Sequence, residues 1–155
     1  MQRRNLGIVS VLILAGLPLA GCEQPIRAVA DGASSQVVAT KVERIAGSEL
    51  NRLTLTARAA ERLAIATAPM AEAQVTRAGS TALRKVVPYS AVLYDSTNHT
   101  WVYTNPQPLV YVRAGITIDY FDGDQAVVTE GPDVGTTVVT VGAAELFGTE
   151  FETAH

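Results

Sequence analysis

The sequence predicts a mainly β fold, a small antiparallel barrel or sandwich with one short helix. From Val86 onward the chain is a series of short runs rich in Val, Thr, Tyr and Ile, which favour strands. Turn compositions separate these runs: DSTNH, NPQP, DGD and PDVG. Five or six strands at this spacing, with no long helical period and no internal repeat, indicate a single small antiparallel domain.

The first 21 residues have the layout of an export signal. Arg3 and Arg4 precede a mostly apolar stretch from Leu6 to Leu19, and small residues follow. The stretch is too short to cross a bilayer comfortably as a helix of the mature protein. We therefore expect residues 1–21 to be a signal peptide.

Cys22 is the only cysteine of the chain. The sequence Leu19-Ala20-Gly21-Cys22 resembles the lipobox of bacterial lipoproteins, in which the cysteine is acylated and the signal is cut before it. Two or more acyl chains give stable membrane attachment, so Cys22 is the predicted lipidation site of a protein that faces the periplasm or the cell exterior. The alternatives are an ordinary signal peptide followed by a free cysteine and an uncleaved anchor, and both still export the protein. Glu23 stands where aspartate is the usual inner-membrane retention signal, which leaves inner or outer membrane open.

Three segments follow before the strand-rich part. Residues 22–47 are rich in Ala, Ser and small polar residues and read as a tether, with a strand possible near Val37 to Ile45. The predicted domain covers residues 48–155 and begins with a short strand around Leu53; Thr56 then caps a helix over Ala57 to Ala64. Residues 71–85 are expected to form a connection or a weak strand.

The charge balance excludes one class of partner. Loss of Arg3 and Arg4 with the signal leaves ten basic and fifteen acidic side chains, a net charge of −5. That balance argues against nucleic acid. From Ala114 to His155 there are eight acidic residues and no Lys or Arg, which favours an acidic solvated edge over an interaction surface.

Two groups of polar residues could indicate a catalytic site or a metal site. Ser90, Asp95 and His99 contain the residue types of a catalytic triad, but they flank a predicted hairpin turn and lack a nucleophile-elbow sequence, so a surface turn is favoured. The run DYFDGDQ places Asp119, Asp122 and Asp124 close together. Gly123 does not fall where a calcium loop requires it, so an Asp-Gly hairpin is favoured.

The sequence offers no convincing metal or cofactor site. His99, His155 and Met70 are far apart in sequence and form a poor ligand set. Trp101 and the tyrosines around it could line a ligand face, although alternating aromatic residues in strands are more often core or cross-strand pairs. We therefore expect no enzymatic activity and no cofactor.

Three stretches together resemble the periplasmic adaptor proteins, or membrane fusion proteins, of tripartite efflux pumps, particularly those that serve heavy-metal and related resistance-nodulation-division transporters. They cover most of residues 50–148: Leu53–Thr56 with Arg62–Pro69, Val87–Leu93 with Trp101–Tyr103, and Gly123–Gly131 with Gly135–Ala143. Glu130-Gly131-Pro132 replaces the Gly-Leu turn of the family, and Thr136 stands where Asp is common.

The chain departs from a full adaptor in its middle. Full adaptors carry two halves of a lipoyl-like domain, a long helical hairpin and a β-barrel between the first and second of these stretches, where this chain has only Ala71 to Lys85. No heptad pattern is present in the sequence. The resemblance therefore implies the membrane-proximal domain alone, which full adaptors assemble from the two ends of their chain, here placed on a lipid anchor.

The resemblance implies a non-enzymatic exported lipoprotein that docks on a membrane efflux transporter, as an accessory or truncated adaptor that could oligomerise around the transporter. Its partner would be a transporter or an adaptor subunit. The docking residues it suggests are Tyr89, Trp101, Tyr103 and Arg113. The alternative is a stand-alone lipoprotein that binds a small ligand or a cell-wall component on its aromatic strands.

Overall fold

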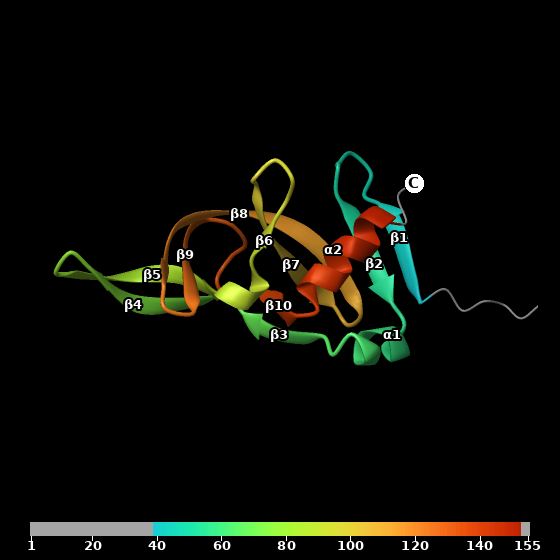
Figure 1. Cartoon of the computed structure of the whole chain (residues 1–155), viewed down its shortest axis with the longest axis horizontal. Coiled ribbons are helices and arrows are strands. Elements are labelled where there is room, and N and C mark those ends of the chain that lie inside the picture. Colours follow the sequence, from blue (N-terminus) through green and yellow to red (C-terminus); the bar gives the residue numbers. More distant parts are fainter. Residues whose placement is uncertain (1–38, 153–155) are drawn as a thin grey trace, which may run out of the picture. The chain divides into compact units, whose positions relative to one another are not determined.

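The computed structural model describes residues 39–152, which form one sheet of ten antiparallel strands with two short helices (Figure 1). The predicted fold class is confirmed. Cys22, the signal segment and His155 lie outside the described residues. The elements are β1 (Thr40–Arg44), β2 (Asn51–Leu55), α1 (Ala57–Arg62), β3 (Ala66–Pro69), β4 (Ala71–Arg77), β5 (Ser80–Pro88), the 3-10 turn η1 (Tyr89–Ala91), β6 (Leu93–Tyr94), β7 (Thr100–Gln107), β8 (Val110–Asp122), β9 (Gln125–Glu130), β10 (Thr137–Val141) and α2 (Ala143–Glu152).

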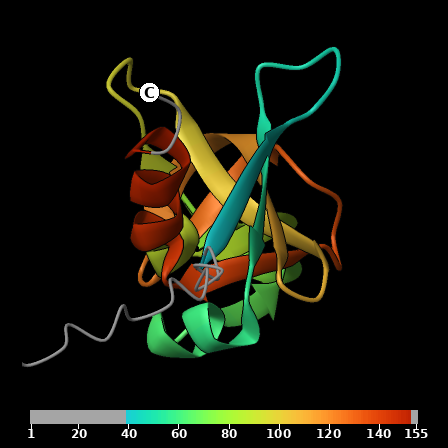
Figure 2. The ribbon, with the colours of Figure 1, turned by 90° about the vertical axis from the view of Figure 1, so that its right-hand side faces the viewer.

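The long strand β8 organises the sheet. On one side it pairs with β7; on its other side its first residues pair with β2 and its last residues pair with β9. The path through the sheet runs β3-β10-β7-β8-β9-β5-β4, so a strand from the start of the domain, β3, closes onto the last strand. The sheet curls as it passes along β8 (Figure 2), and the register shifts between Thr117 and Tyr120 mark bulges at the bend.

The core has two main clusters. One lies between β5, β7, β8, β9 and β10 and includes Val87, Val102 and Val128. The other lies beneath α2 and includes Leu53, Tyr103 and Leu146. Burial of these side chains, each worth about 1.5–3 kcal/mol when fully buried, holds both helices against the sheet.

The first helix forms as its local sequence predicts. The Thr56 side-chain oxygen accepts a hydrogen bond from the Ala59 backbone N–H at 3.2 Å, which caps the helix at the predicted residue. The helix ends at Arg62, two residues before the predicted Ala64, because Ala64 takes a left-handed conformation with φ of 49°. No helix within residues 39–152 is long and apolar enough to cross a membrane.

Two elements differ from the expectations, and a third only extends the domain. Strand β1 lies within Val37 to Ile45, where a strand was considered possible, and the sheet therefore begins at Thr40 and not at residue 48. Residues 71–85 form most of the regular β4–β5 hairpin, with seven consecutive register pairs. A second helix, α2, stands beyond the one short helix that was expected. It begins at Ala143, because Gly142 with φ of +84° ends β10 and redirects the chain.

Candidate functional site

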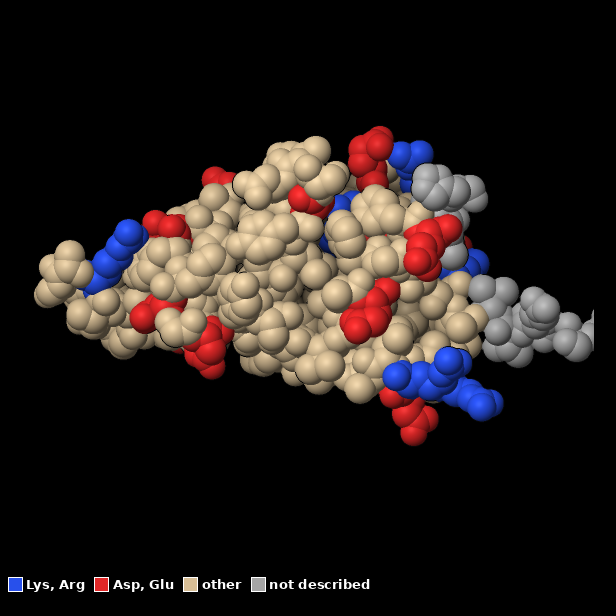
Figure 3. All heavy atoms as spheres, viewed as in Figure 1, with Lys and Arg blue, Asp and Glu red and all other residues tan. Residues whose placement is uncertain are grey.

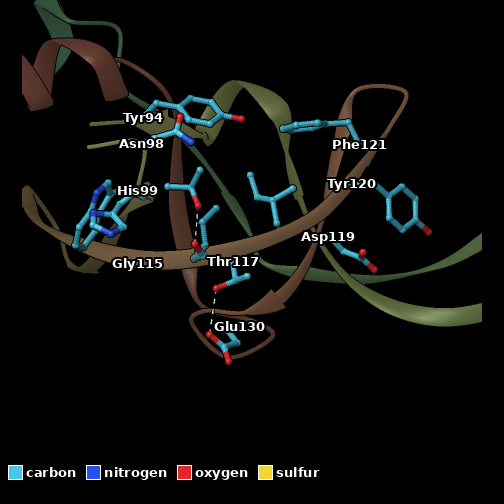
Figure 4. A pocket seen from close by; sticks show the side chains of 13 residues that line it. Tyr94, Asn98, His99, Gly115, Thr117, Asp119, Tyr120, Phe121 and Glu130 are labelled. Carbon is cyan, nitrogen blue, oxygen red and sulfur yellow. Dashed lines mark hydrogen bonds between the residues drawn. The ribbon is translucent and has the colours of Figure 1, made fainter. Parts of the chain in front are cut away.

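Trp101 stands between two hollows on the surface of the domain. The first, which we call the aromatic groove, has a volume of about 850 Å³ and is open to solvent (Figure 4). The second, the Arg113 pocket, has a volume of about 430 Å³ and lies beside α2. Trp101 lies on β7 directly opposite Gly115 of β8, and the missing side chain at Gly115 leaves the indole open to the aromatic groove.

Aromatic and polar side chains line the aromatic groove together. Figure 4 shows Tyr94 and Phe121 along one rim and the hydrogen-bonded pair of Thr117 and Glu130 below, with His99 at one end. The lining residues come from β6, the β6–β7 turn, β7, β8 and the end of β9: Tyr94, Asn98, His99, Thr100, Trp101, Gly115, Ile116, Thr117, Ile118, Asp119, Tyr120, Phe121 and Glu130. No Lys or Arg is among them.

Asp95 fixes the orientation of Trp101. Its Oδ2 accepts a hydrogen bond from the indole N–H at 2.9 Å, and its Oδ1 accepts from the backbone and hydroxyl of Thr97 and from the backbone of His99. The bond from Trp101, then those from Thr97, hold the pKa of Asp95 well below its usual range. The turn therefore presents a fixed indole at the boundary of the two hollows.

A buried polar cluster lies behind the Arg113 pocket. Glu150 of α2 is 0% exposed, and its carboxylate accepts hydrogen bonds from the Tyr103 hydroxyl, from Asn51 Nδ2 at 3.2 Å and from Arg113 Nη2 at 3.4 Å. Arg113 Nε lies 3.3 Å from Glu150 Oε2. The two atoms form an ion pair, but they are not aligned for a hydrogen bond. The guanidinium also stacks over the Trp101 ring at 4.3 Å.

The predicted docking residues divide into two groups. Tyr89 is 56% exposed and contacts Phe121, and Trp101 lines both hollows. Tyr103 is fully buried and Arg113 is only 8% exposed, so the expectation that they belong to a docking surface is wrong. The physical reason is α2, which covers this face of β7 and β8 and pairs both side chains with Glu150.

The residues considered for chemistry do not converge. Ser90 is exposed in η1, and no hydrogen bond joins it to His99 in the part of the chain that the structure describes. The predicted hairpin is present at this run, but its two-residue turn consists of Gly123 and Asp124 and not of Asp122 and Gly123; Asp119 pairs with Arg84 at 2.7 Å. Within residues 39–152 no group of three or more His, Cys, Asp or Glu side chains could hold a metal ion.

Comparisons with protein-family models, with curated proteins and with solved structures found no significant match to this chain.

The cluster around Glu150 is the part of the site that sequence reasoning missed. A signal for it was present: Ala143, Leu146 and Glu150 are spaced as one face of a helix, and all three are buried. A glutamate on an apolar helical face requires a buried partner, and Arg113, in an otherwise apolar part of β8, is the matching cation.

Proposed function

We propose that the protein is a non-enzymatic exported lipoprotein that docks on a membrane efflux transporter, as an accessory or truncated adaptor. The observation that carries this proposal is the pairing of β3 with β10. This pairing joins the adaptor-like stretch Arg62–Pro69 to the stretch Gly135–Ala143. Such a pairing is expected of a membrane-proximal domain, which full adaptors assemble from the two ends of their chain. The sequence Leu19-Ala20-Gly21-Cys22 would hold this domain at the membrane.

Exposed aromatic and aliphatic side chains give such a domain a surface to dock with. Tyr89 and Phe121 meet edge to face, with their ring centroids 5.2 Å apart, and Leu83 on the β4–β5 hairpin is also exposed. On the face drawn in Figure 3, the described Lys and Arg side chains are scattered and form no continuous patch. Contacts that Tyr89 and Phe121 make with a protein partner would be apolar and aromatic.

The test is crosslinking in living cells. A photoreactive residue is placed at Tyr89 in a chain with a C-terminal tag, and the partners that co-purify from solubilised membranes are identified. A transporter or adaptor subunit crosslinked from position 89 supports docking. The matched control places the same residue at Arg58, which is exposed on α1, and should give no such adduct. Failure of position 89 to capture any envelope protein, with the tagged chain present in the membranes, would reject the proposal.

The aromatic groove supports a second candidate function, a stand-alone lipoprotein that binds a small ligand or a cell-wall component. Its volume of about 850 Å³ lies in the range of small-molecule sites. Loss of ligand binding on filling the groove, with crosslinking at position 89 unchanged, would separate this function from docking.

A further inference from the structure

We infer that the aromatic groove binds an uncharged oligosaccharide. This inference rests on the second candidate function, ligand binding in the groove, and names the chemical class of that ligand; it is independent of docking on a transporter.

Two aromatic rings of the groove, those of Tyr94 and Phe121, are exposed and have no cation stacked on them, although Phe121 also contacts Tyr89 edge to face. The Arg113 guanidinium stacks on the Trp101 ring, with its Cζ 4.3 Å from the ring centroid. The Arg77 guanidinium stacks on the Tyr120 ring in the same way, at 4.1 Å. Tyr94 is 49% exposed and Phe121 is 42% exposed, and both stand along the rim of the hollow in Figure 4. Exposed rings of this kind offer an apolar surface to the C–H face of a sugar ring, while the sugar hydroxyls remain in contact with polar groups.

Polar groups in the groove have hydrogen-bonding capacity that the protein does not use. Within residues 39–152 the Asn98 side-chain amide makes no hydrogen bond. The His99 ring uses only Nδ1, which lies 2.9 Å from the Thr97 hydroxyl and 3.5 Å from Asp95 Oδ2. Glu130 accepts only from Thr117, at 3.1 Å. The groove therefore presents both donors and acceptors close to its rings, which is the combination that a polyhydroxyl ligand can satisfy.

The charges of the groove favour a neutral ligand. Among residues 39–152 no Lys or Arg lines it, which disfavours phosphate and acidic sugars. Asp119 is already paired with Arg84 and with Arg77, at 2.7 Å and 3.4 Å. Glu130 is then the one lining carboxylate without an ion pair in the described part of the chain, and an exposed single carboxylate attracts cations only weakly.

An open groove also suits a polymer. The aromatic groove follows β8 from Gly115, opposite Trp101, to Phe121 near the end of the strand. It is open to solvent. A chain of sugar units could lie in such a hollow and continue beyond it at either end.

The test is a binding titration with the full chain in a detergent that contains no sugar. The probes are the tetramer of N-acetylglucosamine and maltotetraose. Trp101 is the only tryptophan of the chain and lines the groove, so its fluorescence reports binding directly. We expect saturable quenching by at least one probe, weakened about tenfold or more by Tyr94→Ala or Phe121→Ala. The control is Leu83→Ala, because Leu83 is exposed and apolar but does not line the groove. This variant should bind the sugar probes as tightly as the parent.

Filling the groove gives a second, independent variant. A Cβ added at Gly115 would lie 3.6 Å from the Trp101 ring, an ordinary contact, so Gly115→Ala should fold and should weaken sugar binding by covering part of the indole. Phe151→Ala, which lines only the Arg113 pocket, should leave sugar binding intact and exclude that pocket as the source of the signal.

Charged probes decide the ligand class. Tetramers of glucosamine and of galacturonate carry positive and negative charges on similar backbones, and we expect both to bind more weakly than the neutral probes. Glu130→Gln removes the negative charge but keeps one side-chain oxygen as an acceptor, so it should weaken binding of the neutral probes less than binding of the glucosamine tetramer. Preferential binding of the glucosamine tetramer, lost in Glu130→Gln, would overturn the uncharged class while keeping ligand binding in the groove. If neither neutral probe binds, the inference is overturned. Docking, which crosslinking measures separately, is unaffected by that result.

Discussion

The Tyr103 hydroxyl of β7 donates a hydrogen bond to the Glu150 carboxylate of α2, and both side chains are fully buried. Together with Arg113 of β8, they tie the last helix to two strands through charge and hydrogen bonds inside the core. A buried carboxylate is tolerated only when such partners satisfy it. The position of α2, and with it the wall of the Arg113 pocket, therefore depends on this cluster.

Glu150→Gln should destabilise the protein strongly. The amide keeps the size of the side chain but leaves the Arg113 guanidinium buried without a counter-charge, which costs about 3–5 kcal/mol in the free energy of unfolding. Urea denaturation followed by circular dichroism measures it. Glu152→Gln, exposed on the same helix, is the matched control and should stay within about 0.5 kcal/mol of the parent. Equal stabilities of the two variants would contradict the role assigned to Glu150.

Tyr103 should make the protein sensitive to alkali. Burial, and secondly the bond to Glu150, raise the pKa of Tyr103 well above its ordinary value of 10.0. Below pH 10 the phenol is protonated in both the folded and the unfolded chain, so its contribution to the free energy of unfolding is fully present. Above pH 10 the unfolded chain loses this proton while the folded chain keeps it, so stability falls by up to about 1.4 kcal/mol per pH unit.

Tyr103→Phe provides the check on this pH dependence. It should lower stability at neutral pH by about 1–3 kcal/mol, because Glu150 loses a donor. It should also flatten the decline above pH 10, measured as urea midpoints across that range. The same alkaline slope in the parent and in the variant would show that other groups cause the decline.

The features of the fold that depend on neighbouring residues could be predicted from the sequence. Thr56 caps α1 through a bond to a residue three positions away, and the turn at Gly123 joins adjacent strands. The β4–β5 turn was not recognised because Ala78, with φ of 51°, occupies a position where Asn is the usual signal before Gly79. Tertiary contacts, and not local preference, hold that unusual residue in place.

The candidate site could be predicted only in part, because its exposure depends on α2. The aromatic residues of β7 were identified, but the alternation of a strand does not say which face a distant helix will cover. Helix α2 contains Gly148 and Thr149, which are weak helix formers, and it is stabilised by burying Leu146 in the core. Tyr103 therefore seemed available for docking, and the structure places it under this helix.

Asp95→Asn should make the protein less sensitive to acid and should loosen Trp101. The pKa of Asp95 is lowered in the folded state from its ordinary value of 3.8, so its contribution is present above pH 3.8 and is lost as the pH falls toward the folded value. Urea midpoints should therefore decline less for Asp95→Asn than for the parent between about pH 4 and pH 2. Trp101 emission should also change at neutral pH, because the indole N–H loses a charged acceptor. Asp133→Asn, on an exposed turn, controls for the loss of one negative charge, and equal behaviour of the two variants would contradict the prediction.

Gly142→Ala and Gly148→Ala should have opposite effects. At Gly142 a Cβ would lie 2.3 Å from Ile65 Cδ1 and 3.2 Å from the Leu63 carbonyl oxygen, on a backbone with φ of +84°. We expect a loss of about 1–3 kcal/mol there. At Gly148, inside α2, a Cβ would have nothing within 4 Å, so alanine should stabilise the helix by about 0.5–1 kcal/mol. Thermal denaturation of both variants checks the pair, and destabilisation by Gly148→Ala would argue against a helical α2.

Cys22→Ala should release the protein from membranes. The proposed acyl chains each contribute about 0.8 kcal/mol per buried methylene, and no helix within residues 39–152 could replace them by crossing the bilayer. Membrane fractionation, with the mass of the purified chain, measures both the anchor and its loss. Glu23→Gln keeps the cysteine and should remain membrane-bound, which controls for changes near the processing site. The proposed docking would place the domain against a membrane transporter, so Cys22→Ala should also lower crosslinking from position 89 when expression is equal. A Cys22→Ala chain that stays in the membrane fraction through a crosslinked partner would separate docking from the lipid anchor.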